Sequence, residues 1–420
     1  MFTPDQPLDF TDSALYDDPW ELYRWLRDDS PMHRDEINDL WVVSRHVDLV
    51  NVSRNTDLYC SGEGVRPKGA SELSLLAMDD PEHTRVRRLV NKGFTPRQVR
   101  AILPHVRELS AELAREVADR GEVDFVEEVA IHVPLIVIAE LMGLDPDTRM
   151  DLYRWSDAMM AGDGRTDPDD PIMLGAAVAF GEYAEVLQRL IAERRQNPTD
   201  DLIGVLTQAH DEGALEELAE ATAVGIPGDD EPLEEHELIM FLVTLLVAGN
   251  ETTRNAISGG LLALSHFPEE HARLREHLDD EAFVDLAVDE LIRYVSPVLS
   301  FTRTVTEDHV YDGGDFTQEL AKGDKILLLY QSANRDERVF DEPDRLVLDR
   351  DPNPHVAFGI GTHYCLGANL ARMEVKVVFE ELLRHLPDLR VPEGARPQRG
   401  SSSLVLALEK LPAVFTPGPA

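Results

Sequence analysis

A chain of 420 residues with 43% hydrophobic content can bury a large core, so general disorder is excluded. Its 80 Asp and Glu residues against 40 Lys and Arg residues give a formal net charge of −40, which argues against a simple nucleic-acid binder and against adsorption to an anionic membrane surface. Only two cysteines occur, Cys60 and Cys365, so we expect no disulfide framework and a reducing compartment, the cytoplasm.

Neither the start of the chain nor its most apolar run predicts membrane insertion. Residues 1–5 carry neither the basic nor the apolar part of a secretion signal. The most apolar run, 238–249, is shorter than the roughly 20 residues that a membrane span requires. We therefore interpret this run as a buried helix and expect no membrane span.

Helical periodicity dominates the sequence. In chain order, we expect a strand at 40–43, helices at 104–120, 182–196 and 233–264, and strands at 325–330 and 403–408. Segments 162–171 and 221–232 predict loops, and 312–323 predicts a hairpin tip. Strands and helices do not alternate regularly and no repeat is visible, which argues against doubly wound and solenoid folds. The prediction is one domain over 1–420, mainly α with small β-sheets.

Polar residues interrupt the apolar central helix. At about 1.5 Å per residue, the helix 233–264 would be about 48 Å long, and Asn250-Glu251-Thr252-Thr253 lies near its middle. Burying such groups is costly unless they have partners or a chemical task. A threonine bonding back to a carbonyl, or a polar cap, is the structural interpretation, and a catalytic task is the other. The helix alone does not decide between them.

Glu290 and Arg293 are three residues apart, so on a helix they share a face and can form an ion pair. A third charged partner would let this pair anchor the loop that carries Cys365. Arg345 and Arg350 are both candidates for that partner, and the sequence does not choose between them. The alternative is an ordinary solvated pair on a helix surface.

The segment 358–367, with the sequence Phe-Gly-Ile-Gly-Thr-His-Tyr-Cys-Leu-Gly, places Cys365 directly before a helical pattern. A thiolate at a helix N-terminus is stabilised by the helix dipole and by unpaired N–H groups. The glycines let the backbone approach a flat, bulky group, and thiolate ligation of haem iron suits such a loop. A buried free cysteine is the simplest alternative. Zinc bound by His363 and Cys365 is another, but no second Cys/His pair supplies the remaining ligands.

This segment resembles the haem-binding loop of the cytochrome P450 family, Phe-Gly-x-Gly-x-His-x-Cys-x-Gly, at every fixed position. Residues 248–253 resemble the family's oxygen-activation motif, and Glu290-Leu291-Ile292-Arg293 resembles its Glu-x-x-Arg pair. The resemblance extends from about Tyr16 to Pro417. It implies a single-domain cytochrome P450 fold with haem b (iron protoporphyrin IX), whose iron Cys365 would bind.

The resemblance also implies roles for individual residues. Thr252 would hydrogen-bond the dioxygen under activation, and Glu251 would help relay protons to it. Phe358 and Gly359 would contact the cofactor at the start of the loop. The cationic residues that correspond to the family's propionate ligands are His83, Arg87, Arg303 and His355. For His355 the alternative is a core histidine whose ring is satisfied by the backbone.

The implied reaction is an NAD(P)H-dependent monooxygenation of a hydrophobic small molecule, in which one oxygen atom enters the substrate. Electrons would arrive from ferredoxin and ferredoxin reductase, because two cysteines are too few for an iron–sulfur cluster and no flavin module is visible. A peroxygenase and a non-catalytic haem-thiolate binding protein are the rivals. The pair Glu251 and Thr252 argues against both.

A basic segment at 85–100 stands out from the acidic chain, because it contains six Lys or Arg residues and no acidic residue. On a helical wheel Arg85, Arg88 and Lys92 lie opposite His83 and Arg87. We therefore expect these three residues to face outward and to bind an acidic partner, the ferredoxin. The alternative is a merely solvated basic face.

Several short phrases give the chain its resemblance to actinobacterial steroid side-chain hydroxylases, namely 64–67, 78–81, 197–201 and 249–254. The implied substrate is a cholesterol- or cholestenone-like steroid that is hydroxylated on its side chain. Fatty acids and terpenoids remain alternatives, since the segments 162–171, 221–232 and 312–323 depart from the family pattern.

Overall fold

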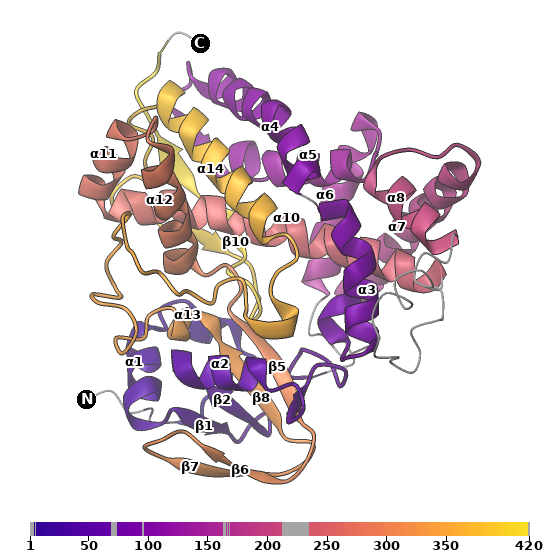
Figure 1. Ribbon diagram of the computed structural model, residues 1–420. Helices are drawn as coiled ribbons and strands as arrows, with labels where there is room; N and C mark the ends of the chain where they lie inside the picture. Colours follow the sequence, from indigo (N-terminus) through magenta and orange to yellow (C-terminus); the bar gives the residue numbers. More distant parts are fainter. Residues whose placement is uncertain are drawn as a thin grey trace. The chain divides into compact units, whose positions relative to one another are not determined.

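The computed structural model describes residues 4, 6–68, 74–94, 96–162, 165, 167, 169–211 and 235–418. Helices account for most of these residues and the strands form small sheets, which confirms the predicted mainly α class (Figure 1). The chain divides into two compact units: unit 1 contains Met1–Tyr59, Ile102–Pro134 and Glu251–Ala420, and unit 2 contains Cys60–Ala101 and Leu135–Asn250. The single domain over 1–420 stays a prediction.

The helices follow the predicted order but are longer than predicted at several ends (Figure 1). The helix predicted at 104–120 runs over 96–117, the one at 182–196 over 171–196, and the central one over 235–266. The α-helices are α1 Trp20–Asp29, α2 His46–Arg54, α3 Glu82–Val90, α4 Pro96–Val117, α5 His132–Leu141, α6 Arg149–Ala161, α7 Pro171–Gln196, α8 Leu202–Asp211, α10 Glu235–His266, α11 Pro268–Glu276, α12 Glu281–Val295, α13 Tyr330–Ala333 and α14 Ala368–His385.

The main sheet of unit 1 is organised around strand β8 (Lys325–Leu329), which is buried from Ile326 to Leu329. Strand β2 (Leu40–Val43) pairs with β8 in parallel and with β1 (Met32–Asp35) antiparallel, and β5 (Ser300–Val305) pairs with the other edge of β8. Because side chains alternate along a strand, Leu327 and Leu329 join the cluster that contains α1 side chains, and Ile326 and Leu328 join the one that contains α2 side chains. The predicted strand at 40–43 is confirmed, and the one at 325–330 is confirmed except for its last residue, because Tyr330 begins α13.

Among its described residues, unit 1 also contains three two-stranded sheets. They are β6 (His309–Asp312) with β7 (Thr317–Leu320), β4 (Glu122–Asp124) with β11 (Pro412–Val414), and β9 (Gln398–Arg399) with β10 (Leu408–Lys410); the short strand β3 is Tyr59–Cys60. The hairpin predicted at 312–323 exists, but its tip is narrower because β7 lies inside that range. The described residues of 162–170 form turns or have no regular structure, Pro171 already begins α7, and 221–232 lies outside the described residues.

The strand predicted at 403–408 is wrong for most of its length. Only Val405 forms an isolated bridge, and β10 begins at Leu408. The side chain of Ser402 accepts hydrogen bonds from the N–H groups of Leu404 and Val405, both at 3.1 Å, and Ala407 has a φ of 49°. These local bonds and the left-handed residue divert the backbone from an extended ladder.

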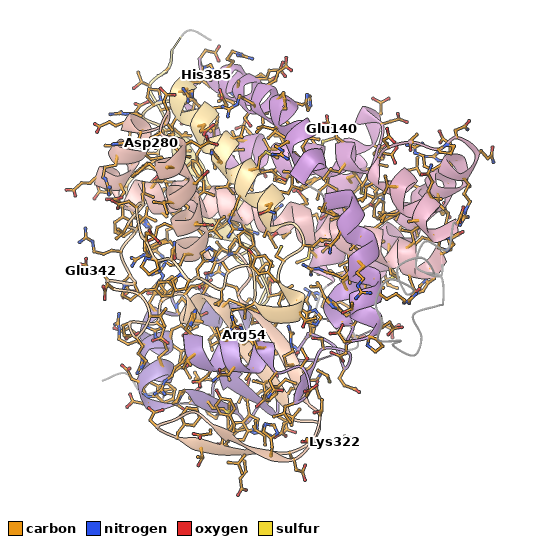
Figure 2. All side chains as sticks on the ribbon, viewed as in Figure 1. Arg54, Glu140, Asp280, Lys322, Glu342 and His385 are labelled. Carbon is orange, nitrogen blue, oxygen red and sulfur yellow. The ribbon has the colours of Figure 1, made fainter. Side chains whose placement is uncertain are left out.

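Helix α10 has the properties expected of the predicted central helix. Its first turn carries Glu235 and Glu237, which matches the negative charge favoured at the N-terminus of a helix. It ends at His266, and Pro268 begins α11. None of the helices that the structure describes combines the length and the apolar character of a membrane-spanning segment. On unit 1, charged side chains such as those of Asp280, Lys322 and Glu342 are exposed (Figure 2).

Glu374 is a carboxylic acid in the core of α14. The residue is 2% exposed, and its Oε2 has no hydrogen-bond partner among the described residues. Burial raises the pKa of Glu374 from 4.5 to about 8. The folded chain therefore keeps this group protonated at neutral pH, where the unfolded chain would ionise it.

Replacing this acid should stabilise the protein in a pH-dependent manner. Between pH 5 and 7.5 the unfolded state releases a proton that the folded state retains, so the native chain loses about 1.4 kcal/mol of stability per pH unit from this group. The advantage of Glu374→Gln in denaturant unfolding should grow over that interval. Glu380→Gln makes the same substitution on the same helix and serves as the control. It breaks the 2.6 Å ion pair with Arg107, so it should not stabilise the protein. An advantage of Glu374→Gln that does not change with pH would contradict the assignment.

Candidate active site

The segment that carries Cys365 is a tight loop in unit 1 that ends at the first turn of α14. The N–H of Cys365 donates to the carbonyl of Phe358 at 2.8 Å, which closes the loop on itself. Gly361 has a φ of +77°, and a Cβ at this position would lie 2.9 Å from the carbonyl oxygen of Ser53 on α2. Glycine is therefore required there both by the backbone angle and by the close approach of α2.

The loop suits a flat ligand that is bound through sulfur. Cys365 is exposed, and a Cβ built at Gly367 beside it would meet no atom within 4 Å. Cys365 lies three residues before Ala368, the first residue of α14, and a helix N-terminus favours a nearby thiolate. Within the described residues no group of three or more His, Cys, Asp or Glu side chains could hold a metal ion, which disfavours the zinc alternative. The donor set fits a haem whose iron takes one thiolate.

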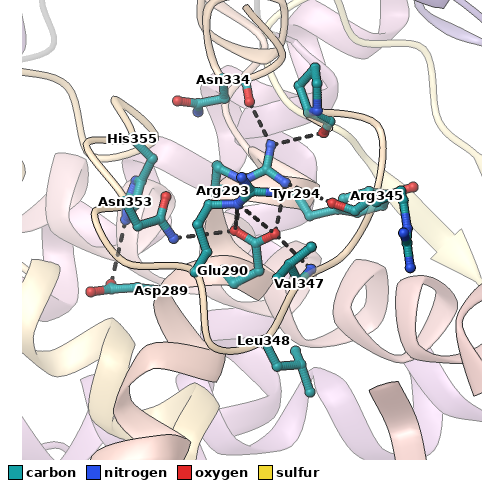
Figure 3. A network of polar contacts seen from close by, with 12 residues as sticks. Asp289, Glu290, Arg293, Tyr294, Asn334, Arg345, Val347, Leu348, Asn353 and His355 are labelled. Atoms are coloured by element: carbon teal, nitrogen blue, oxygen red, sulfur yellow. Dashed lines mark hydrogen bonds and ion pairs between the residues drawn. The ribbon is translucent and has the colours of Figure 1, made fainter. Parts of the chain in front are cut away.

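Glu290 and Arg293 form a buried ion pair on α12 (Figure 3). Neither side chain is exposed, and Arg293 donates from Nε and Nη2 to the two carboxylate oxygens at 2.7 and 2.8 Å. The remaining N–H groups of Arg293 donate to the carbonyls of Asn334, Pro343 and Arg345 at 2.7 to 3.1 Å. All five donors of the guanidinium are thereby used, so the solvated-pair alternative is excluded.

The third charged partner of this pair is Arg350. Its Nε lies 3.0 and 3.2 Å from the two oxygens of Glu290, and its side chain is 9% exposed. Arg345 contributes only its backbone carbonyl, and its side chain is 57% exposed and pairs with Glu342. The choice that the sequence left open is therefore settled by the path of the backbone between α13 and the Cys365 loop.

The buried network also reaches toward the Cys365 loop through asparagines that the sequence reasoning missed. Asn353 donates to Glu290 at 3.3 Å (Figure 3). The side chain of Asn334 accepts from the N–H of Val356 at 2.7 Å. Val356 lies two residues before Phe358. These contacts join segments far apart in sequence, so no spacing pattern could have indicated them.

The carboxylate of Glu251 on α10 has side-chain partners, as the cost of burying a charge requires, whereas Asn250 Oδ1 and Arg254 Nε are buried without a hydrogen bond among the described residues. The buried carboxylate of Glu251 accepts hydrogen bonds from Arg254 at 2.5 Å and from Asn255 at 2.9 Å. Asn255 in turn accepts from the N–H of Leu408 at 2.7 Å, which ties this turn of α10 to β10. Arg254 and Asn255 were also missed, although their positions three and four residues after Glu251 are the positions that share its helix face. Thr252 is half-buried.

Two of the predicted propionate ligands, Arg303 and His355, lie in unit 1. Arg303 on β5 is buried and donates to the carbonyl of Thr302 at 2.8 Å. The ring of His355 is almost fully buried, with its Nε2 3.4 Å from Asp289 and its Nδ1 accepting from the N–H of Ala357 at 3.3 Å. Both nitrogens of His355 therefore have protein partners, and its propionate role stays a prediction.

The other two candidates, His83 and Arg87, lie on α3 in unit 2. His83 is buried, with its Nδ1 3.7 Å from Asp80. Burial lowers the pKa of His83, although the nearby carboxylate of Asp80 acts to raise it. The lowered pKa favours the neutral ring. Arg87 is half-buried. Their propionate role is not tested by these contacts.

The prediction that Arg85 faces outward is wrong. Its side chain is 9% exposed and donates to Glu237 of α10 at 3.0 Å, within unit 2. A helical wheel describes one helix alone and does not show which face a neighbouring helix covers. Arg88 is half-buried, and the side chain of Lys92 lies outside the described part of the chain.

Comparison with known proteins identifies the family. The family model described as Cytochrome P450 matches residues 171–415. A steroid C26-monooxygenase of Mycolicibacterium smegmatis is 37% identical over 94% of this chain and 92% of its own length, and one of Mycobacterium tuberculosis is 35% identical over 94% of each. Two solved structures agree. CYP109E1 from Bacillus megaterium in complex with testosterone is 30% identical, with a TM-score of 0.82 over 96% of this chain and 99% of its own. Mycobacterium marinum CYP268A2 in complex with pseudoionone is 33% identical, with a TM-score of 0.83 over 99% of this chain and 100% of its own.

The chain therefore belongs to the cytochrome P450 family and is a monooxygenase. Its cofactor is haem b, and it uses dioxygen and electrons from NAD(P)H that arrive through redox partners. The resemblance stated from the motifs is confirmed over almost the whole chain.

The buried network gives a prediction that separates its two arginines. Arg350→Ala removes the Nε contacts to both oxygens of the buried Glu290 and should cost about 1.5–3 kcal/mol of unfolding free energy, the range for hydrogen bonds to a charged group. Arg345→Ala keeps the backbone carbonyl that Arg293 uses and removes only an exposed pair, so it should cost less than about 1 kcal/mol. Denaturant unfolding of both variants, with haem content measured in parallel, tests this. Equal losses in the two variants would contradict the assignment of Arg350.

Proposed function

We propose that this cytochrome P450 hydroxylates the side chain of a steroid, with Cys365 as the thiolate ligand of the haem iron. The observation that carries the ligand assignment is the exposed thiol of Cys365 in a glycine-shaped loop at the start of α14, directly after a segment held by the Glu290 network. Haem with a thiolate ligand supplies the electron density that promotes cleavage of the O–O bond. The rest of the chemistry is positioning and proton supply by the chain.

The chain's own groups have distinct tasks in this proposal. The N-terminus of α14 would favour Cys365 as the thiolate that binds the iron. Thr252 donates a hydrogen bond from its hydroxyl near the reacting oxygen, and Glu251 passes protons along the same helix turn. Arg303, His355, His83 and Arg87 would supply charge and hydrogen bonds to propionates, and Phe358 and Gly359 would contact the cofactor at the start of the loop.

The steroid substrate rests on the relatives. Steroid C26-monooxygenases match this chain over 94% of its length, and a P450 structure that matches it contains testosterone. Fatty-acid and terpenoid substrates are the alternatives, since a matching structure of P450BioI contains an acyl carrier protein ligated to hexadec-9Z-enoic acid. The choice among these classes depends on which apolar ligand displaces water from the iron.

A spectral titration tests the substrate class. Cholestenone should shift the haem from low to high spin at micromolar concentration, and the product should carry its hydroxyl at the end of the side chain. Testosterone is the matched control, because it shares the ring system and lacks the side chain, so it should bind more weakly. A full shift with palmitoleate or a terpenoid, and none with cholestenone, would overturn the steroid proposal.

The proton supply is tested by a pair of neighbouring threonines. Thr252→Ala removes the proposed donor, so NADH consumption should continue while hydrogen peroxide released per NADH rises severalfold and product falls. Thr253→Ala makes the same change at a buried position one residue further and should leave coupling close to normal. Normal coupling in Thr252→Ala would assign Thr252 to a structural role. Efficient turnover with peroxide alone would favour a peroxygenase, and no NADH-linked product would favour a binding protein.

We also propose that the electron donor is a ferredoxin, reduced by ferredoxin reductase, that docks near Arg88 and Lys92. A chain with charge −40 repels an acidic donor elsewhere, and the segment 85–100 is its basic exception. Because such attraction is screened over about 10 Å at 0.1 M salt, Arg88→Glu should slow ferredoxin reduction at low salt and leave CO binding intact. An unchanged rate would place the docking site elsewhere. The low cysteine content supports a cytoplasmic location.

A further inference from the structure

Arg372 on α14 contacts both ends of the Cys365 loop, although nothing in the function proposed above uses it. Its guanidinium carbon lies 4.5 Å from the centre of the Phe358 ring, where the loop begins. Its Nη1 donates to the hydroxyl of Tyr364 at 3.2 Å, and Tyr364 directly precedes Cys365. One side chain therefore touches the first residue of the loop and the residue next to the sulfur.

The same guanidinium is fixed to a neighbouring helix. Its Nε donates to Asp289 on α12 at 2.6 Å. The Nε2 of His355 also lies 3.4 Å from the same carboxylate (Figure 3). Burial opposes ionisation of Asp289, but the bonds from His355 and Arg372 outweigh it and lower its pKa. Asp289 thus remains a carboxylate, next in sequence to Glu290 of the buried network. Every group named here belongs to unit 1.

We propose that Arg372 is a positioning residue that clamps the Cys365 loop between α12 and α14 and so fixes the direction of the sulfur toward the haem iron. The planar guanidinium suits this task because it can pair with Asp289, donate to Tyr364 and stack on Phe358 at the same time. The backbone bond between Cys365 and Phe358 closes the loop from inside, and Arg372 holds the two ends from outside. This inference rests on the proposed ligation by Cys365.

The competing explanation is that Arg372 only braces α14 against α12. The chain offers a direct comparison, because Lys376, one helix turn later, makes the equivalent pair with Asp285 on α12 at 2.7 Å. Arg372 and Lys376 thus bridge the same two helices. Both ion pairs that the structure gives for Lys376 are with α12 residues, whereas Arg372 also contacts the Cys365 loop. A bracing role predicts similar effects for the two residues. A clamp predicts an effect on the thiolate ligation for Arg372 alone.

The test compares Arg372→Met, Arg372→Lys, Tyr364→Phe and Lys376→Met in the haem-loaded protein. Two readouts are used: the rate at which the ferrous–CO complex loses the red-shifted band of thiolate ligation, and the reduction potential of the haem. Arg372→Met should lose the band about five-fold faster than the native protein and shift the potential, while Lys376→Met should remain within about two-fold. Tyr364→Phe, which removes one of the three contacts, should lie between them.

Arg372→Lys separates charge from shape. Lysine can pair with Asp289 but cannot also stack and donate in a fork, so the clamp predicts that it restores only part of the native behaviour. If Arg372→Met does not retain haem, Arg372→Lys and Tyr364→Phe decide. Native band lifetimes and potentials in both, or equal effects in Arg372→Met and Lys376→Met, would overturn the clamp. Absence of the red-shifted band in the native protein would instead overturn ligation by Cys365.

Discussion

The buried charges of Glu290, Arg293 and Arg350 are the constraint on which the rest of the site depends. One carboxylate and two guanidinium groups in a core carry an excess positive charge, which is costly to remove from water. The structure offsets that cost with backbone carbonyls, because both arginines also donate to main-chain oxygens between 334 and 345. The network thereby fixes a segment that has little regular secondary structure of its own.

That fixed segment leads directly into the loop of Cys365. Asn334 holds Val356, the loop closes between Phe358 and Cys365, and α14 begins immediately afterwards. The polar turn of α10 is fixed by a comparable strategy, since Arg254 and Asn255 hold the buried carboxylate of Glu251. Glu290 is also held directly by Arg350 from a distant segment, whereas Glu251 is held by its own helix, and the distant Leu408 bonds to Asn255 instead.

The sequence predicted what depends on local spacing. The pair Glu290 and Arg293, the central helix and the thiol before α14 all follow from positions within one element, and the structure contains each of them. Contacts made by the path of the backbone were not predictable: the choice of Arg350 over Arg345, and the asparagines that join the network to the loop. The prediction that Arg85 faces outward was wrong because its partner, Glu237, comes from another helix. The prediction of a strand at 403–408 was wrong because the side chain of Ser402 accepts the backbone N–H groups of Leu404 and Val405.

The most direct test of this account is the ferrous–CO spectrum of two single-cysteine variants. Cys365 and Cys60 are the two cysteines of the chain, so Cys60→Ala is the matched control for Cys365→Ala. The account predicts that Cys60→Ala keeps the red-shifted band of a thiolate-ligated haem, and that Cys365→Ala loses this band together with monooxygenation. Survival of the band in Cys365→Ala, or its loss in Cys60→Ala, would contradict the assignment of Cys365 as the ligand.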